Sequence, residues 1–196
     1  MDGQIDSGRS ITGNLCTALS LLSVVLCLVP LAWHVKNRNI PACSLIIWIA
    51  LFNSFVFTNS LIWPTGDVSN WWDGAIFCDI QAKFFWASYA GDSGALAAIM
   101  RNLARVMDVD RGVLVPTKSQ RKREMIIELS YCYAYPIFHI ATHYIVQSNR
   151  YYIFQIVGCT ASWDWSWPTI VLIYIWPSIF CLIGSYYTGK IPHSAL

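Results

Sequence analysis

The chain has 196 residues, of which 56% are hydrophobic and only 12% are charged. Soluble proteins carry about 25% charged residues, so this composition excludes a soluble globular domain. The formal net charge of +2 is too small to indicate nucleic-acid binding, and we expect no nucleic-acid partner. An apolar exterior is stable in lipid, and the composition therefore predicts an all-α integral membrane protein.

Five apolar stretches are long enough to cross a bilayer as helices, because about 20 residues at 1.5 Å each span roughly 30 Å. They are residues 11–33, 41–63, 76–101, 125–147 and 168–187. The first resembles a signal peptide in position only, since it is of spanning length and no small-x-small cleavage site follows it. No repeat or second domain interrupts the pattern, which predicts one transmembrane helix bundle over residues 1–196.

The orientation of the bundle follows from its lysines and arginines, which cytoplasmic loops retain. Ten of the thirteen basic residues fall on one side of the predicted bundle: Lys36, Arg38, Arg101, Arg105, Arg111, Lys118, Arg121, Lys122, Arg123 and Lys190. The loops on the other side are poor in positive charge, so we predict that the N-terminus lies outside the cytosol. Tryptophans such as Trp63 and Trp167 flank the outer ends of the stretches and are interpreted as interfacial anchors.

Of the seven cysteines, only Cys78 and Cys159 fall on the predicted outer side. That side faces an oxidising compartment, so a disulfide tying the second outer loop to the third helix is the economical interpretation. The alternative is two free thiols. The other five cysteines lie within predicted spans, where free cysteine behaves as a small hydrophobe.

The third helix carries the most polar and small residues. One stripe, at 100° per residue, contains Asp79, Lys83, Trp86, Ala90, Ser93, Gly94, Ala97 and Arg101. Asp92 projects from the opposite side, and a helix that is polar on two faces belongs at the centre of a bundle. Gly91, Gly94, Ala95 and Ala98 should let neighbouring backbones approach closely. Asp79 and Lys83, four residues apart, are expected to form an ion pair.

Asp92 is the one carboxylate deep inside a predicted span. A charge there is costly, which makes Asp92 a functional-site hypothesis. The alternative is a structural hydrogen bond to the second helix, through Asn53 or Asn59. In the fourth and fifth helices, Pro136 and Pro177 must each break a backbone hydrogen bond and bend the helix.

No pattern in the sequence predicts an enzyme, a metal site or a cofactor. His139 and His143 share a helix face, but Ile140 stands where a metalloprotease needs glutamate, so two interfacial histidines are the favoured interpretation. A Gly-rich phosphate loop, a nucleophile elbow and a CxxC pair are all absent from the sequence. Asp110 and Arg111 are too far beyond Arg101 to form a switch at the inner end of the third helix.

Several short motifs resemble one family by their order and spacing. They are residues 34–39 in the first inner loop, 71–74 leading into 78–80, 101–104 after the third helix, 158–159 in the second outer loop, and 167–169 and 176–177 in the fifth helix. With these motifs the chain is similar to the fungal pheromone receptors of the a-factor receptor type, class D G-protein-coupled receptors. The resemblance implies seven spans, of which five are present here.

The resemblance also implies a lipidated peptide mating pheromone as ligand, a heterotrimeric G protein as partner, and the plasma membrane as location. Candidate ligand-binding residues are Lys83, Trp86, Asp92, Trp71, Trp72, Trp163 and Trp165. Candidate G-protein-facing residues are Arg101, Arg105, Arg121, Lys122 and Arg123; contact of the last three with anionic membrane lipid is the alternative. A small transporter or channel subunit, with Lys83, Asp92 and Asn53 along a polar path, is the competing hypothesis.

Overall fold

The computed structural model describes residues 11–107 and 117–194, with side chains described as far as residue 189. Three long helices come first: α1 (Ile11–Lys36), α2 (Ile40–Ile62) and α3 (Ala75–Met107). A fourth rod joins α4 (Lys118–Leu129), the π-helical turn η2 (Ser130–Ala134) and α5 (Tyr135–Val146). A fifth joins α6 (Trp167–Thr169), the π-helical turn η3 (Ile170–Tyr174) and α7 (Ile175–Ser194). The connections contain the 3-10 turn η1 (Val68–Asn70) and the strands β1 (Tyr152–Phe154) and β2 (Gly158–Thr160).

Three of these rods are long and apolar enough to cross a membrane: Ile11–Lys36, Ile40–Ile62 and Trp167–Gly189. Their outward side chains are large and apolar; Val29 on α1, for example, is 77% exposed. Such a surface is stable in lipid, so the described part is that of a helical membrane protein. The other two rods fall outside this set because α3 carries charged residues along its length and α4 is rich in them. The number of five spans stays a prediction.

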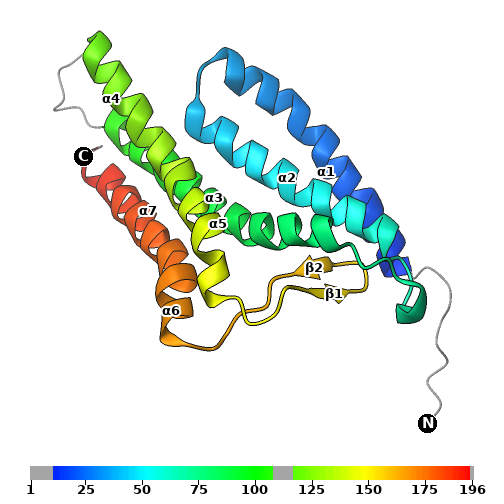
Figure 1. The fold of residues 1–196 in the computed structure, drawn as a ribbon. Helices are drawn as coiled ribbons and strands as arrows, with labels where there is room; N and C mark the ends of the chain where they lie inside the picture. Colours follow the sequence, from blue (N-terminus) through cyan, green and yellow to red (C-terminus); the bar gives the residue numbers. More distant parts are fainter. Residues whose placement is uncertain (1–10, 108–116, 195–196) are drawn as a thin grey trace.

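Helix α3 lies at the centre of the bundle, as expected from its two polar faces. It packs against α2, α5, η2 and α7, and Figure 1 shows it crossing between the α1–α2 hairpin and the other two rods. A Cβ on Gly94 would lie 2.1 Å from the carbonyl oxygen of Tyr131, and one on Gly91 would lie 2.3 Å from Nε1 of Trp48. The prediction that small residues on α3 permit close approach is confirmed.

The two prolines free backbone carbonyls that aromatic side chains then bind. Pro136 has no N–H for the carbonyl of Cys132, four residues earlier, and the indole Nε1–H of Trp48 donates to that oxygen at 3.3 Å. Pro177 likewise leaves the carbonyl of Ile173, and the hydroxyl of Tyr135 donates to it at 3.1 Å. The π-helical turns end two residues before Pro136 and three residues before Pro177. Each irregularity is therefore satisfied by a neighbouring helix, as lipid requires.

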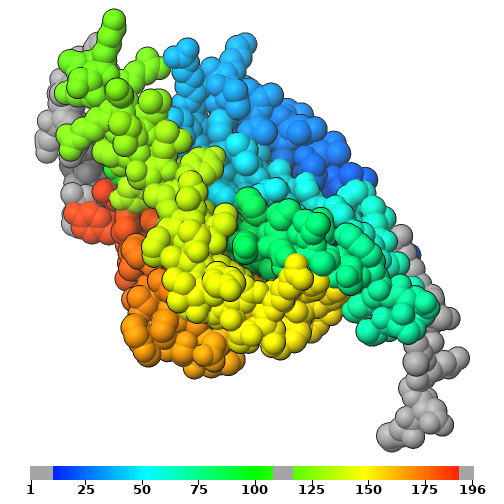
Figure 2. All heavy atoms as spheres, in the orientation of Figure 1, coloured from blue at the N-terminus to red at the C-terminus, as the bar shows by residue number. Residues whose placement is uncertain are grey.

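One end of the bundle, which we call the disulfide end, is built from residues 63–78 and the β1–β2 hairpin. Strand β1 pairs antiparallel with β2, with Ile153 opposite Cys159, and a disulfide joins Cys159 to Cys78 on α3. Figure 2 shows the hairpin segment, in yellow, packed against the green surface of α3. Trp63 is fully buried beside the disulfide, so its interpretation as an interfacial anchor is wrong. Its ring is needed to fill the space beneath the hairpin.

The opposite end, which we call the basic end, comprises the α1–α2 turn, the last turns of α3 and the first turns of α4. Helix α3 continues to Met107, past the predicted end at residue 101, and α4 begins at Lys118, before the predicted start at residue 125. A capping box between Thr117 and Gln120 fixes that start. Hydropathy detects only the apolar part of a helix, which is why both predictions were too short. Asp110 and Arg111 lie outside the described residues.

Candidate functional site

A cavity of about 520 Å³ lies between α3 and α5 at the disulfide end. Asp79 and Lys83 line it from one face of α3, since residues four apart share a helix face. His143, near the end of α5, lines it from the other side, and Gln147 and Arg150 line it from the segment that follows. The cavity therefore gathers charged and polar groups from two parts of the chain that are distant in sequence.

Asp79 pairs with Arg150, and the expected pair with Lys83 is wrong. Arg150 donates from Nε to Oδ1 of Asp79 at 2.9 Å and from Nη2 to Oδ2 at 2.5 Å, a bidentate contact that suits the planar guanidinium. The hydrogen bond to Asp79, together with its charge, raises the pKa of Arg150. Because Asp79 pairs with Arg150, Lys83 is left without an ion pair among the described residues that line this cavity, although its charge also helps to stabilise the carboxylate of Asp79.

Four rings form a wall beside Lys83. Trp86 and Trp163 meet edge to face with ring centroids 4.9 Å apart. Trp163 also contacts His143 at 5.3 Å and His139 at 6.3 Å between centroids. The backbone fixes this arrangement, because Gln147 and Trp163 form an antiparallel bridge just after α5. The bridge brings Trp163, from the loop after β2, to the face of α3.

His139 and His143 are only 1% exposed, so their interpretation as interfacial histidines is wrong. Within residues 11–107 and 117–194, none of their four ring nitrogens has a hydrogen-bond partner. A buried polar atom left without a partner costs about 1–3 kcal/mol, and such groups gather where a ligand supplies the partner. The same part of the chain holds no group of three residues suited to a metal ion. The imidazoles are therefore candidate contacts for polar groups of a ligand.

A second cavity of about 240 Å³ lies deeper in the bundle, on the far side of this wall. Its lining is mainly apolar and aromatic: Trp86, Tyr89, Ala90, Tyr135, His139, Ile173, Tyr174 and Pro177. Tyr135 is held there by its hydrogen bonds to the carbonyls of Leu172 and Ile173. His143 lines the first cavity and His139 the second, and Trp163 contacts both imidazoles. A polar and an apolar cavity thus lie on either side of the contact between His143 and His139, whose ring centroids are 6.0 Å apart.

The structure brings together three of the seven candidate ligand-binding residues: Lys83, Trp86 and Trp163. Trp72 instead stacks on buried Trp63, with ring centroids 6.2 Å apart, and Trp71 donates from Nε1 to the carbonyl of Thr65 at 2.9 Å. Both tryptophans therefore pack the disulfide end, away from the two cavities.

The other two candidates also lie apart from the cavities. Trp165 is 94% exposed in the loop before α6. Asp92 lines neither cavity, and the alternative of a hydrogen bond to Asn53 or Asn59 of α2 is not found among the described residues. Asn53 donates to the carbonyl of Ile49, Asn59 donates to that of Val157, and Oδ1 of Asp92 is enclosed without a partner among the described residues.

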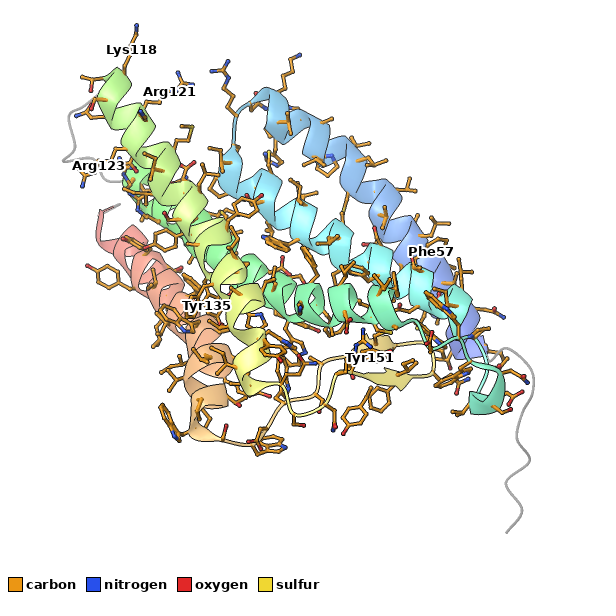
Figure 3. The ribbon with its side chains drawn as sticks, in the orientation of Figure 1. Phe57, Lys118, Arg121, Arg123, Tyr135 and Tyr151 are labelled. Atoms are coloured by element: carbon orange, nitrogen blue, oxygen red, sulfur yellow. A yellow bond between two sulfur atoms is a disulfide. The ribbon has the colours of Figure 1, made fainter. Side chains whose placement is uncertain are left out.

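The five candidate residues at the basic end divide into two groups. Arg101 and Arg105 both donate to Oε2 of Glu124, the former at 2.7 Å, so they clamp α3 to α4. Burial alone would raise the pKa of Glu124, but the hydrogen bonds and charges of Arg101 and Arg105 outweigh it and lower the pKa. Arg121, Lys122 and Arg123 are exposed on α4, and Figure 3 shows Arg121 and Arg123 on opposite sides of the helix.

Two residues that hold helices together, Glu124 and Tyr135, were not predicted from the sequence. Glu124 is an isolated acid directly after three basic residues, a signal that could have predicted a clamp. Tyr135 gave no such signal, because its role depends on a carbonyl freed by Pro177 on another helix.

Comparison with known protein families identifies the class to which this protein belongs. The family model described as Pheromone A receptor matches residues 15–194. The chain belongs to the Pheromone A receptor family. This is a family of receptors and not of enzymes, and its match covers the disulfide, both cavities and the Glu124 clamp.

Individual relatives agree with the family. The chain is 33% identical over 171 residues to the Pheromone a factor receptor of Saccharomyces cerevisiae, which covers 86% of this chain and 35% of that protein. It is 29% identical over 177 residues to the Pheromone B alpha 3 receptor of Schizophyllum commune, covering 90% of this chain and 28% of that protein. This family member thus spans about a third of the length of these relatives. No solved structure gives a significant match.

Proposed function

We propose that this chain forms the ligand-binding part of a G-protein-coupled receptor for a lipidated peptide mating pheromone in the plasma membrane. The observation that carries the proposal is the pair of adjoining cavities, one polar around Lys83 and one apolar around Trp86 and Tyr135. A peptide with a lipid anchor has the same two-part character. The names of the relatives support a pheromone as the ligand class.

The membrane arrangement proposed here is one receptor domain over residues 1–196, with five of seven spans and the N-terminus outside. The disulfide end then faces the exterior, where a disulfide persists, and the basic end faces the cytosol. The exposed residues Arg121, Lys122 and Arg123 are the proposed G-protein contacts. Arg101 and Arg105 act indirectly, by holding α3 and α4 in register through Glu124.

A lipid anchor contributes to binding before any specific contact forms. Each buried methylene-sized group is worth about 0.8 kcal/mol, so partitioning concentrates the ligand at the membrane. Apolar burial discriminates weakly between similar chains, and specificity then comes from polar contacts. Lys83, His139 and His143 are the groups that can make such contacts with the peptide part.

The test uses a full-length receptor carrying these residues, challenged with matched peptides with and without the lipid. We expect the lipidated peptide to be the more potent, and equal potency would contradict the proposed ligand class. Trp86→Ala should weaken binding by about tenfold to a hundredfold, the range for a buried aromatic anchor. Trp165→Ala removes the same side chain from an exposed position and should leave affinity within about twofold.

The cytosolic contact needs a separate test. Neutralising Arg121, Lys122 and Arg123 together should leave ligand binding intact and reduce G-protein activation at equal surface expression. Unchanged activation would leave these residues only a role in lipid contact.

A further inference from the structure

A groove of about 670 Å³ opens at the basic end, between the α1–α2 turn, α3 and α4. It is separate from both cavities at the disulfide end. Its walls are apolar and come from the first turns of α2 and the last turns of α3: Leu45, Ile46, Ile99, Leu103 and Val106. Leu103 is 45% exposed and Val106 83% exposed, so the groove is open along α3.

The mouth of the groove is polar and contains a cation, Arg38, whose backbone is held in a turn. Arg38 occupies the left-handed region with φ 54°, and its N–H donates to the carbonyl of Val35 at 3.0 Å, which holds it in the turn that ends α1. No acidic residue in the described ranges pairs with Arg38. His34 also lines the mouth, and its Nδ1 is enclosed without a partner there. The acidic member, Glu128, accepts a hydrogen bond from Asn102 at 2.7 Å.

The position of the groove matches the boundary between hydrocarbon and headgroups. Its α2 wall belongs to the first turns of a helix that can cross a membrane. Its α3 wall from Ile99 to Val106 rises about 10 Å, enough to hold the part of an acyl chain nearest the headgroup. Figure 2 shows the α1–α2 turn and α4 as separate projections at this end, and both carry exposed basic residues.

We propose that this groove is a binding site for one anionic phospholipid, with an acyl chain along the α2 and α3 walls and the phosphate beside Arg38 and His34. Because Glu128 already accepts a hydrogen bond from Asn102, the unpaired charge of Arg38 favours an anionic headgroup, and the open apolar walls favour a chain that enters from the bilayer. This site is independent of the ligand cavities and does not rest on the identity of the pheromone.

The first test counts lipids retained by the purified full-length protein, using native mass spectrometry with phosphatidylserine and phosphatidylcholine in equal supply. Arg38→Gln removes the charge and should lower phosphatidylserine retention by about tenfold or more, as for a lost hydrogen bond to a charged group. Lys36→Gln changes the net charge equally at an exposed position outside the groove. Its effect should stay within about fivefold, the value for diffuse attraction to a charged surface.

A second pair of variants changes volume without changing charge. Ala42 lines the groove, so Ala42→Trp should displace the lipid, whereas Ile47→Trp places the same ring on the exposed face of α2 and should not. Equal losses for Arg38→Gln and Lys36→Gln, with retention intact in Ala42→Trp, would overturn the site. Retention of phosphatidylcholine or of a sterol at the same level would overturn the anionic selectivity.

A third measurement needs no variant, which matters if Ala42→Trp fails to fold. Phosphatidylserine with a photoreactive group in its acyl chain should cross-link preferentially to the groove walls, at Ile46, Ile99 and Leu103. Leu22 and Val25 on α1 are apolar positions outside the groove, each 52% exposed, and provide the reference. Cross-linking spread evenly over α1 and the groove would contradict the proposal.

Discussion

The two ends of the bundle are held together by different forces. At the disulfide end, a covalent bond between Cys78 and Cys159 is surrounded by buried aromatic rings, and Asn59 of α2 donates to the carbonyl of Val157 at 2.6 Å. At the basic end, α3 and α4 meet through ion pairs of Arg101 and Arg105 with Glu124. The first set of contacts is indifferent to salt, whereas the second is partly exposed and screened.

The two ends therefore differ in rigidity: the disulfide end is fixed, whereas the basic end is adjustable. A cross-link between residues 81 apart in sequence constrains the loop after α5 in all states, so the cavity beside it has a rigid frame. Ion pairs at a helix end exchange partners at low cost, so the basic end is the more adjustable of the two.

The largest effect on stability is expected where α3 crosses η2, because α3 connects the two ends of the bundle. Gly94→Ala would press a methyl group into the carbonyl of Tyr131, and backbone cannot move aside without separating α3 from η2. We expect Gly94→Ala to lower the free energy of unfolding by more than the roughly 1–3 kcal/mol that is usual for overpacking, and folded protein to be lost. Gly184→Ala is the matched control, since its nearest atom would be 3.8 Å away. Normal yield of folded Gly94→Ala would show that this crossing does not couple the ends.

The next effect tests the frame of the disulfide end. Cys78→Ser, or the double change with Cys159→Ser, should lower the free energy of unfolding by about 2–4 kcal/mol, measured in detergent with urea. Cys181→Ser removes an exposed free thiol and should have little effect. Non-reducing peptide mapping should recover the cross-linked pair, and two free thiols would remove the basis of the comparison.

At the basic end, Glu124→Gln should cost about 1–3 kcal/mol because it leaves two guanidinium groups with a neutral partner. Arg123→Gln changes one charge on the same helical turn at an exposed site and should stay within about 0.5 kcal/mol. The loss in Glu124→Gln should shrink at high salt, unlike the loss in Cys78→Ser. Equal salt dependence would contradict the proposed difference between the ends.

The same carboxylate predicts a pH dependence. The pKa of Glu124 lies below its ordinary value of 4.5, so its contribution to stability is complete above about pH 4.5 and is lost as the pH falls through the lowered pKa. Thermal unfolding of wild type and Glu124→Gln should therefore differ by a constant amount from neutral pH down to about 4.5. The difference should narrow below that pH, and a constant difference at lower pH would exclude Glu124 as the titrating group.

The smallest effect on stability should come from Arg150→Gln, although it breaks a bidentate ion pair. The side chain of Arg150 is 60% exposed, and solvent-exposed ion pairs contribute little to stability. Its effect on the cavity should be larger, because Asp79 would then be free to neutralise Lys83. Arg150→Gln should therefore lower the free energy of ligand binding by more than it lowers the free energy of unfolding. A larger effect on unfolding would show that Arg150 supports the fold and not the cavity.

The sequence by itself determined the class of fold, the central position of α3 and the candidate pair of outer cysteines. These follow from hydropathy, from small residues at helical spacing and from the sides on which charges fall, which are all local properties. The same reasoning placed Lys83, Trp86 and Trp163 among the ligand candidates. It gave too short an α3 and α4, since charged turns continue a helix without an apolar signal.

Only the tertiary structure decided which side chains share a site. Trp63, Trp71 and Trp163 have the same chemistry and similar loop positions, but the fold buries the first, packs the second at the disulfide end and places the third against two imidazoles. Asp79 pairs with Arg150 and not with Lys83, because the loop after α5 returns to the start of α3. These contacts join residues that are far apart in sequence. The number of residues between two such positions does not predict the distance between them in the fold.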